Sequence, residues 1–426
     1  MNWLLLAAML QVDVTPQEEI PITVTGSSRI EYLHRTRPIP RVRAALNSPI
    51  TAQSESLFRS ELELSLEADL GKEIRAGIGL KKPAWEEGED IEMGSDLSEN
   101  ILIEELYVHF ENFLMPELEL RFGTQDFAYS LRPGREPFFL GTPNSESFFA
   151  GTSTFVRNTA DRDYFVPMGV SLLYNPHLAI EIEFWAGTVI GGGSTTSDES
   201  MYGIFLNGLL SERTAWNLVS TLITGEGSDR EIYTIGFALD HYLTQSRSLE
   251  LFFEFYWQFG SLDETNDRAA TALAIGAAWY GDGWTVEGSY TMRSGDEDPF
   301  DQKEKTFQSY EDINQFAIIE SASLGLDIDT NVSSIRLSAT VDIFEHSTLR
   351  FDIGYFHFLE KVRNSTGFAL APSQELGTEL DVTLEHHMND SVTLFVTGAV
   401  IHSEFFDQIA EESETSLFVS GAQIEF

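Results

Sequence analysis

The sequence of 426 residues has no cysteine, no long hydrophobic run and few basic residues. Without cysteine, a disulfide framework and thiolate metal sites are excluded. No stretch of 18 or more residues is wholly apolar, so a membrane-spanning helix is excluded too. Only 26 Lys and Arg accompany 68 Asp and Glu, a formal net charge of −42 that argues against nucleic acid as a partner. A soluble protein with an acidic surface, as in a salt-adapted organism, would share this imbalance and remains an alternative.

What the sequence has in quantity is strict alternation of apolar and polar residues. In residues 60–70, five apolar side chains alternate with a polar set that includes four carboxylates. Successive side chains on a strand point to opposite faces, so one face is apolar and the other acidic. The closing segment places Phe418, Ala422, Ile424 and Phe426 on one face and ends on an aromatic residue. Such strands are typical of an outer-membrane β-barrel that pairs its last strand with its first.

Further segments repeat the pattern and predict the fold class. The segments are residues 74–81, 118–123, 180–185, 249–259, 335–343 and 379–385. Aromatic residues make up 12 %, with 31 Phe, although the mean hydropathy is only −0.12. This combination suits strands with one lipid-facing and one wet face better than a buried core. We therefore predict an all-β, transmembrane, antiparallel up-and-down β-barrel in the outer membrane of a Gram-negative-type bacterium.

Short and long connections alternate along the chain, as expected for periplasmic turns and outer loops. Short turns are expected at residues 71–72, 115–116, 175–177, 211–213, 281–283, 345–347 and 388–390. Long polar connections are expected at residues 35–56, 83–100, 127–164, 191–200, 294–330, 359–375 and 403–414. The segment Phe316–Asp329 could be a strand, but this would give an odd total and reverse the turn order. We assign it to an outer loop that folds into the pore mouth, which leaves about eighteen strands and a water-filled lumen.

The first residues predict a leader rather than part of the fold. Residues 1–15 are expected to be a signal peptide, and residues 20–426 a single barrel. An apolar core runs from Trp3 to Leu10, but no Lys or Arg precedes it and no clear small-x-small cleavage site follows. A buried first helix is the alternative.

Two motifs resemble the alginate-export family of outer-membrane proteins. The stretch Tyr290–Asp301 with Thr306 and Phe307 is similar to the family's Ser-Gly-Asp-x-Asp-Pro…Thr-Phe motif, and Leu376–Leu384 is similar to its Leu-Gly-x-Glu-x-Asp strand. The motif residues are Ser294, Gly295, Asp296, Asp298, Pro299, Thr306, Phe307, Gly377, Glu379 and Asp381. Weaker likeness covers residues 58–62, 120–125 and 230–236.

The resemblance implies an eighteen-stranded barrel whose arginine-lined constriction exports an anionic polysaccharide such as alginate, with possible export partners in the periplasm. Inward-facing bases would bind the cargo: Arg29, Arg59, Arg75, Lys81, Arg121, Arg293, Arg336 and Arg350. Guanidinium groups suit this role because they bind carboxylate bidentately. Alternatively, these bases pair with neighbouring carboxylates and brace the wall.

Three functional hypotheses follow, and none involves catalysis. The first is a channel that exports an anionic polysaccharide. The second is a cation-leaning or substrate-specific diffusion porin, because the lumen faces carry more acids than bases and a ring of carboxylates selects cations. The third is a structural or adhesive barrel with a plugged lumen. In all three the expected surroundings are outer-membrane lipid and lipopolysaccharide.

Asp296, Asp298 and Asp301 supply closely spaced oxygens of the kind calcium prefers. Their spacing does not match an EF-hand loop, and a solvated acidic loop is the alternative. No other cofactor is expected. The sequence has no phosphate-binding Gly-rich loop, HExxH or nucleophile-elbow motif, so we expect no enzyme.

Overall fold

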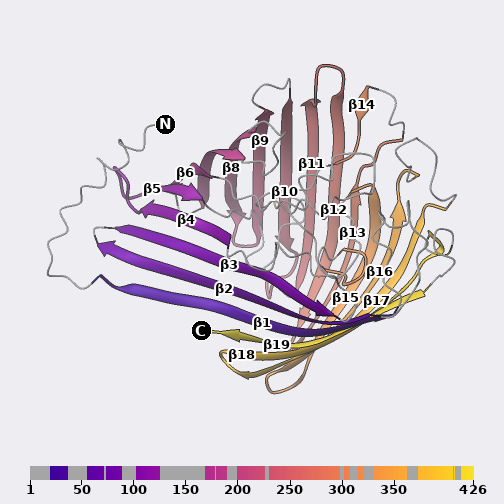
Figure 1. Ribbon diagram of the computed structural model, residues 1–426. Coiled ribbons are helices and arrows are strands. Elements are labelled where there is room, and N and C mark those ends of the chain that lie inside the picture. Colours follow the sequence, from indigo (N-terminus) through magenta and orange to yellow (C-terminus); the bar gives the residue numbers. More distant parts are fainter. Residues whose placement is uncertain are drawn as a thin grey trace.

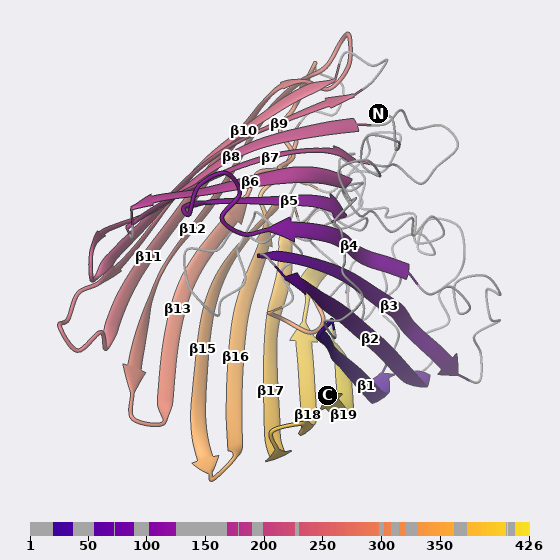
Figure 2. The ribbon, with the colours of Figure 1, turned by 90° about the vertical axis from the view of Figure 1, so that its left-hand side faces the viewer.

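The structure is a computed structural model of the full chain (Figure 1). It describes residues 20–36, 55–71, 73–88, 102–124, 168–177, 179–189, 199–225, 230–297, 302–307, 315–320, 330–361, 373–405, 407 and 414–426. Within these ranges, nineteen strands form one sheet. All but the two-residue β14 follow one another antiparallel around a closed barrel (Figures 1 and 2). The predicted barrel of about eighteen strands is confirmed.

The strands of the first half are β1 (Ile22–Thr36), β2 (Glu55–Gly71), β3 (Ile74–Gly88), β4 (Leu102–Phe110), β5 (Leu118–Thr124), β6 (Met168–His177), β7 (Ile180–Val189), β8 (Glu199–Ser211) and β9 (Thr214–Gly225). Those of the second half are β10 (Glu231–Tyr242), β11 (Leu249–Ser261), β12 (Asp267–Gly281), β13 (Trp284–Arg293), β14 (Lys303–Glu304), β15 (Val332–Phe344), β16 (Ser347–Phe358), β17 (Glu375–Asn389), β18 (Val392–His402) and β19 (Glu414–Glu425). β14 pairs in parallel with the start of β12.

The barrel closes where the last strand meets the first. β1 pairs with β19 from Ser27 opposite Glu425 to Thr36 opposite Ser416, while its other edge pairs with β2. The final residue takes part, because the Phe426 amide donates to the Gly26 carbonyl at 3.0 Å and the Gly26 amide donates to the Phe426 carbonyl at 2.8 Å. Within the described residues this pairing joins the two ends of the sheet, as a sheet in lipid requires.

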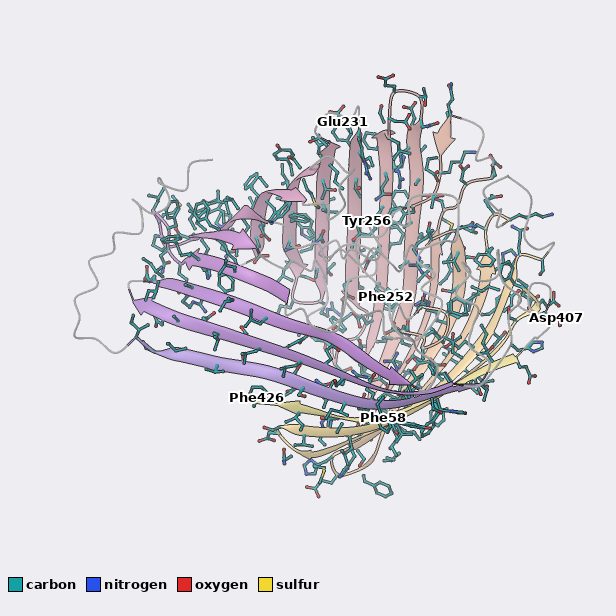
Figure 3. All side chains as sticks on the ribbon, viewed as in Figure 1. Phe58, Glu231, Phe252, Tyr256, Asp407 and Phe426 are labelled. Carbon is teal, nitrogen blue, oxygen red and sulfur yellow. The ribbon has the colours of Figure 1, made fainter. Side chains whose placement is uncertain are left out.

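Burial is inverted relative to a soluble protein. On β10 and β11 the outward side chains are apolar and exposed, as in Trp257 at 46 %, whereas the inward Thr234 and Gln258 are 0 % exposed. Phe252 and Tyr256 share the inner face of β11 with Gln258 (Figure 3). The alternation therefore places the apolar side chains toward lipid and the polar ones inside, against the alternative of a soluble acidic protein. Among the described residues, no helix is both long and apolar enough to cross a membrane.

The connections follow the predicted alternation, with two differences. Short turns that join β12 to β13, β15 to β16 and β17 to β18 lie along one rim (Figure 2). The connections β9–β10, β10–β11 and β11–β12 are short as well, and the sequence pattern did not distinguish them. The long connection expected from Pro83 was placed too early, since β3 continues to Gly88. Pro83 lies opposite a register shift between Ser60 and Leu62 of β2. Such an irregularity in the pairing tolerates a proline, because proline cannot donate a hydrogen bond to the neighbouring strand.

The segment Gln315–Glu320, between β13 and β15, is a turn rather than a strand. Its residues Phe316, Ile318 and Ile319 are 0 % exposed. They contact side chains on the inner face of the barrel, as described below. For these residues the assignment to an inward-folding loop is confirmed, and residues 321–329 of that prediction lie outside the described residues. The expected signal peptide also lies outside them.

Candidate functional site in the barrel interior

Two sets of charged side chains on the inner face are candidates for function. We call the first the inner latch, which consists of Gln315–Glu320 with Arg293, Arg336, Glu379 and Asp381. We call the second the open wall, which comprises inward side chains of β2–β5 and one residue, Glu111, of the turn between β4 and β5. The open wall comprises Glu61, Glu63, Glu67, Arg75, Tyr107, His109, Glu111, Glu119 and Arg121. The two sets use the same residue types but differ in their accessibility.

In the inner latch, two carboxylates of β17 hold the backbone of the turn. The Ile318 and Ile319 amides donate to the two Glu379 carboxylate oxygens at 2.6 and 2.9 Å. The Ala317 amide donates to Asp381 Oδ2 at 2.9 Å. Both carboxylates face inward because their neighbour Leu380 points outward and is 43 % exposed. Three successive amides that no helix or sheet satisfies thus find acceptors on the wall.

An ion-pair cluster holds the end of the same turn. Arg336 of β15 binds the Glu320 carboxylate through both terminal nitrogens, with Nη1 donating to Oε2 at 3.2 Å and Nη2 donating to Oε1. Arg293 of β13 approaches Glu320 Oε1 with Nη2 at 3.8 Å. All three side chains are 1 % exposed. A bidentate, fully desolvated pair of this kind fixes geometry much more strictly than a surface pair.

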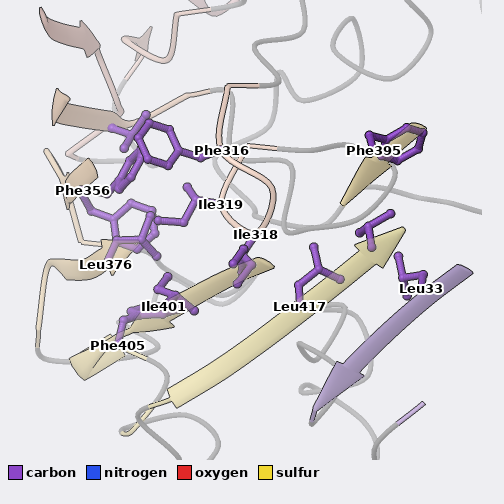
Figure 4. Packing of buried hydrophobic residues seen from close by; sticks show 14 residues of the cluster. Leu33, Phe316, Ile318, Ile319, Phe356, Leu376, Phe395, Ile401, Phe405 and Leu417 are labelled. Atoms are coloured by element: carbon purple, nitrogen blue, oxygen red, sulfur yellow. The ribbon is translucent and has the colours of Figure 1, made fainter. Parts of the chain in front are cut away.

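Apolar packing completes the inner latch. Phe316 meets Phe356 of β16 edge-on with ring centroids 5.1 Å apart. Ile318 and Ile319 belong to the same buried cluster, which has members on β15–β19 and β1 (Figure 4). The other members are Leu33, Val332, Phe358, Leu376, Phe395, Ala399, Ile401, Phe405, Leu417 and Val419. This apolar section of inner wall would be costly to hydrate, and the turn covers part of it.

The Ser294 motif supports the beginning of the same connection. Ser294 Oγ accepts the Thr271 amide at 2.9 Å and donates to the Lys305 carbonyl at 2.6 Å, and the Ser294 carbonyl accepts the Phe307 amide at 2.9 Å. Arg268 donates to the Thr306 carbonyl at 3.0 Å. Phe307 is 1 % exposed in a second interior cluster on β7–β12. Both sequence motifs therefore contribute residues that position the connection between β13 and β15.

The two motif glycines have steric reasons to be glycine. Gly377 has φ 138°, and an added Cβ would lie 2.2 Å from the His402 carbonyl oxygen of β18. At Gly295 a Cβ would lie 2.0 Å from the Asn331 side-chain oxygen. Gly377 faces backbone at a positive φ and therefore excludes larger residues, whereas at Gly295 the Asn331 side chain would have to move.

The open wall carries charges that remain accessible. Arg75 of β3 pairs with Glu67 at 3.5 Å and with Glu111, and these three side chains are between 35 and 39 % exposed. Tyr107 donates to Glu67 at 2.8 Å, and the Arg121 guanidinium lies 3.8 Å from the Tyr107 ring centroid. The surrounding wall is polar and predominantly acidic, so a solute passing along it would meet charged groups in water.

His109 extends the open wall toward β5. Its Nε2 lies 3.1 Å from a Glu119 carboxylate oxygen, and the two side chains are 18 and 36 % exposed. A protonated imidazole would pair with this carboxylate, whereas a neutral one would act as an ordinary hydrogen-bond partner.

The predicted bases whose side chains are described contact different carboxylates or rings. Arg293 and Arg336 meet at Glu320, whereas Arg29 pairs with Glu31 at 2.5 Å and Arg350 pairs with Asp352 at 2.7 Å. Arg75 and Arg121 belong to the open wall. The side chains of Arg59 and Lys81 lie outside the described residues. Wall-bracing contacts thus exist for several bases, while binding of cargo by the eight bases stays a prediction.

Sequence reasoning missed Glu320, although it lies at the centre of the inner latch. Its one local signal is a polar residue directly after the apolar run Phe316–Ile319 in a connection that was expected to be outer loop. The calcium hypothesis stays a prediction, since Asp298 and Asp301 lie outside the described residues. Within the residues described, no group of three or more His, Asp or Glu is placed to hold a metal ion.

Comparison with known proteins relies on structure alone, because no family model and no curated protein matches the sequence. OccK5 (OpdH) from Pseudomonas aeruginosa superposes with a TM-score of 0.58 at 9 % identity, covering 95 % of this chain and 98 % of that one. The outer membrane protein opdK from the same organism gives a TM-score of 0.57 at 10 % identity, covering 95 and 99 %. OpdQ gives 0.56 at 11 %, covering 95 and 97 %.

The chain is an outer-membrane β-barrel. At these identities the likeness shows the fold. It supports an outer-membrane barrel and does not favour the alginate-export family specifically.

Proposed function

We propose that this protein is a passive diffusion channel for small solutes that favours cations. Eighteen strands form a barrel wide enough to leave an aqueous channel when its interior is polar. The main support is the open wall, where accessible inward carboxylates outnumber the bases. Inward acids that keep partial exposure on β2–β7 are Glu61, Glu63, Glu67, Glu119, Glu181 and Glu183, and the partly exposed Glu111 lies in the turn between β4 and β5. The bases described among them are Arg75 and Arg121.

The physical basis is electrostatic focusing. Fixed carboxylates on a low-dielectric wall raise the local concentration of cations and lower that of anions. Arg75 offsets Glu67 and Glu111, so the excess charge comes from the remaining acids of the same wall. Long-range attraction of this kind is screened by salt, so the preference should be greatest at low ionic strength.

Export of an anionic polysaccharide is the second candidate, and the two sequence motifs favour it. In that function the arginines would form an accessible constriction. The burial of Arg293 and Arg336 against Glu320 speaks against such a role for this pair. An acidic open wall would also repel a polyuronate. A diffusion channel therefore fits the described interior better.

Planar-bilayer recording tests the proposal. The purified barrel should give steady conductance and, under a KCl gradient, a reversal potential of the sign for cation preference. Alginate oligomers added to either side should not block the current. Anion preference with block by alginate would favour export, and a complete lack of conductance would favour the structural barrel with a plugged lumen.

A matched pair of variants locates the selectivity. Glu111→Gln together with Glu119→Gln should move the reversal potential toward zero, because both carboxylates are about one-third exposed, Glu119 on β5 and Glu111 in the turn before it. Glu345→Gln removes a carboxylate that is 91 % exposed on the β15–β16 turn and serves as the control. Equal shifts in both would place the selectivity outside the open wall.

A further inference from the structure

The turn between β4 and β5 differs from the other turns of its rim. The turns β8–β9, β12–β13, β15–β16 and β17–β18 each contain two residues, and none of these residues is apolar apart from glycine: 212–213, 282–283, 345–346 and 390–391. The β4–β5 turn, residues 111–117, instead carries Phe113, Leu114 and Met115 in succession, and we call it the apolar turn. Two polar residues suffice to reverse a strand, so chain reversal does not explain the three apolar ones.

The apolar turn presents its tip to the surroundings. Leu114 is 86 % exposed, more than any other large apolar side chain among the described residues, and Met115 is 44 % exposed. Leu114 also has a φ of 66°. A leucine rarely adopts a positive φ, because its Cβ then approaches the following carbonyl oxygen, and such a conformation persists only where other contacts fix it.

Backbone hydrogen bonds supply those contacts. The Phe113 amide donates to the Leu118 carbonyl at 2.6 Å, and the Leu118 amide donates to the Met115 carbonyl at 3.1 Å. The Glu111 amide donates to the Glu73 carbonyl of the neighbouring turn at 2.8 Å. The tip is therefore held in a preorganised shape, which lowers the entropy that binding would cost.

Phe113 connects the tip to the lipid-facing surface. Its ring centroid lies 6.1 Å from that of Phe110, and Phe110 meets Phe122 edge-on at 6.3 Å. Phe110 and Phe122 point outward, because their chain neighbours His109 and Arg121 belong to the inner face. The apolar turn thus continues the surface with which the outer-membrane barrel contacts lipid.

Two exposed carboxylates flank the tip. Glu117 ends the apolar turn directly before β5, and Glu73 lies beside its first residue through the backbone hydrogen bond to Glu111. At a membrane surface, carboxylates attract a headgroup that carries an ammonium group and repel one with a net negative charge. The tip therefore combines an apolar end with a negatively charged border.

We propose that the apolar turn is a lipid-binding anchor. Leu114 and Met115 enter the acyl region of the leaflet at this rim, which is the one expected to face the periplasm. Glu73 and Glu117 bind the ammonium group of a zwitterionic phospholipid such as phosphatidylethanolamine. Burial in lipid removes the apolar tip from water, which is favourable in proportion to its area. The anchor depends on the barrel and the membrane, and does not rest on the proposed channel function.

The absence of cysteine makes the position of the tip measurable. Leu114→Cys gives a single site for a bimane fluorophore, and Glu345→Cys gives a matched site on the polar β15–β16 turn. In phosphatidylcholine vesicles, phospholipid brominated on its acyl chains should quench the label at position 114 severalfold more than the label at position 345. Met115→Cys replaces Leu114→Cys if that variant does not refold. Equal quenching at the tip and at position 345 would place the tip in water and overturn the proposal.

A second comparison tests the headgroup. At low salt and equal mole fraction in phosphatidylcholine, brominated phosphatidylethanolamine should quench the label at the tip more than brominated phosphatidylglycerol. Adding Glu73→Gln and Glu117→Gln should abolish this difference, while quenching by both lipids stays above that at position 345. Equal or reversed quenching by the two lipids with both carboxylates present would overturn their role in binding the headgroup.

Discussion

The inner latch and the open wall combine arginine and carboxylates on strands of the same barrel, yet they differ in solvent exposure. Arg336 and Glu320 are each 1 % exposed, whereas Arg75 and its partners Glu67 and Glu111 are between 35 and 39 % exposed. A desolvated pair is sensitive to the loss of either member, while an accessible pair is screened by water and salt. The comparison teaches that burial decides whether a charged pair holds the structure or interacts with solutes.

Segment packing is the cause of this difference. The turn Gln315–Glu320 covers the inner face of β15–β17 and brings its own carboxylate to Arg336. On the open wall the charged side chains are only partly buried. The inner latch therefore anchors a connection to the inner face, whereas the open wall presents accessible charged side chains.

The largest difference in stability between the two regions should appear when one arginine is removed from each. Arg336→Met leaves Glu320 buried without its bidentate partner and should lower the free energy of unfolding by about 3–5 kcal/mol. Arg75→Met, the matched change in the open wall, should cost less than about 1 kcal/mol because its partners are accessible. Urea unfolding of both variants in micelles measures the difference. Similar losses would show that the two regions are energetically alike.

The next effect tests how the inner latch holds its backbone. Glu379→Ala leaves the Ile318 and Ile319 amides without acceptors, and each buried unsatisfied amide costs about 1–3 kcal/mol. We expect a loss of roughly 2 kcal/mol or more, with a larger and noisier conductance. Glu385→Ala, an exposed inward residue of the same strand, should stay within about 0.5 kcal/mol of the wild type. If Glu379→Ala changed neither the free energy of unfolding nor the conductance, Glu379 would have no role in holding the turn.

A smaller change in stability, but a clear one in selectivity, is expected in the open wall. Glu67→Gln frees Arg75 from one of its two carboxylates. The accessible wall becomes less negative, so cation preference should fall while unfolding changes by less than about 1 kcal/mol. Reversal potentials at low and high salt measure this, and the shift should shrink as salt rises. An unchanged preference at low salt would contradict a role for this wall.

The smallest effect lies outside both regions, in the turn between β11 and β12. Asp263 accepts hydrogen bonds from Asn266 and Thr265, which lower the pKa of its carboxyl to about 2 from the usual 3.8. A lowered pKa means that the stabilisation is present above about pH 4 and is lost as the pH falls toward 2. The protection of the turn amides against exchange, relative to their intrinsic rates at each pH, should fall over this range. Asp263→Asn should abolish the acid dependence, whereas Glu264→Gln should retain it.

The sequence predicted the barrel well because strand orientation depends on local alternation. The outward apolar and inward polar faces of β2, β11 and β17 could be read directly from their residues. Strand parity also identified Phe316 as part of a connection. The prediction that a long connection begins at Pro83 was wrong, because the continuation of β3 past this residue depends on a register shift in the neighbouring strand β2.

The candidate site was predictable only in part. Arg293, Arg336, Glu379 and Asp381 were recognised as inward or as motif residues, but their common partner Gln315–Glu320 was not. Its contacts link residues 16 and about 60 positions apart in the chain, and alternation carries no information at such separation. Residue type also gave no means to distinguish a buried arginine from an accessible one.

The sequence by itself determined that this chain spans a membrane as strands, which face of each strand meets lipid, and where the barrel closes. These properties depend on a two-residue period and on the need of lipid-exposed backbone for internal hydrogen bonds. Only the tertiary structure decided that one connection turns inward and places Glu320 between Arg293 and Arg336. That choice depends on which distant surfaces lose water together, because desolvation acts between segments that are neighbours in space rather than in sequence.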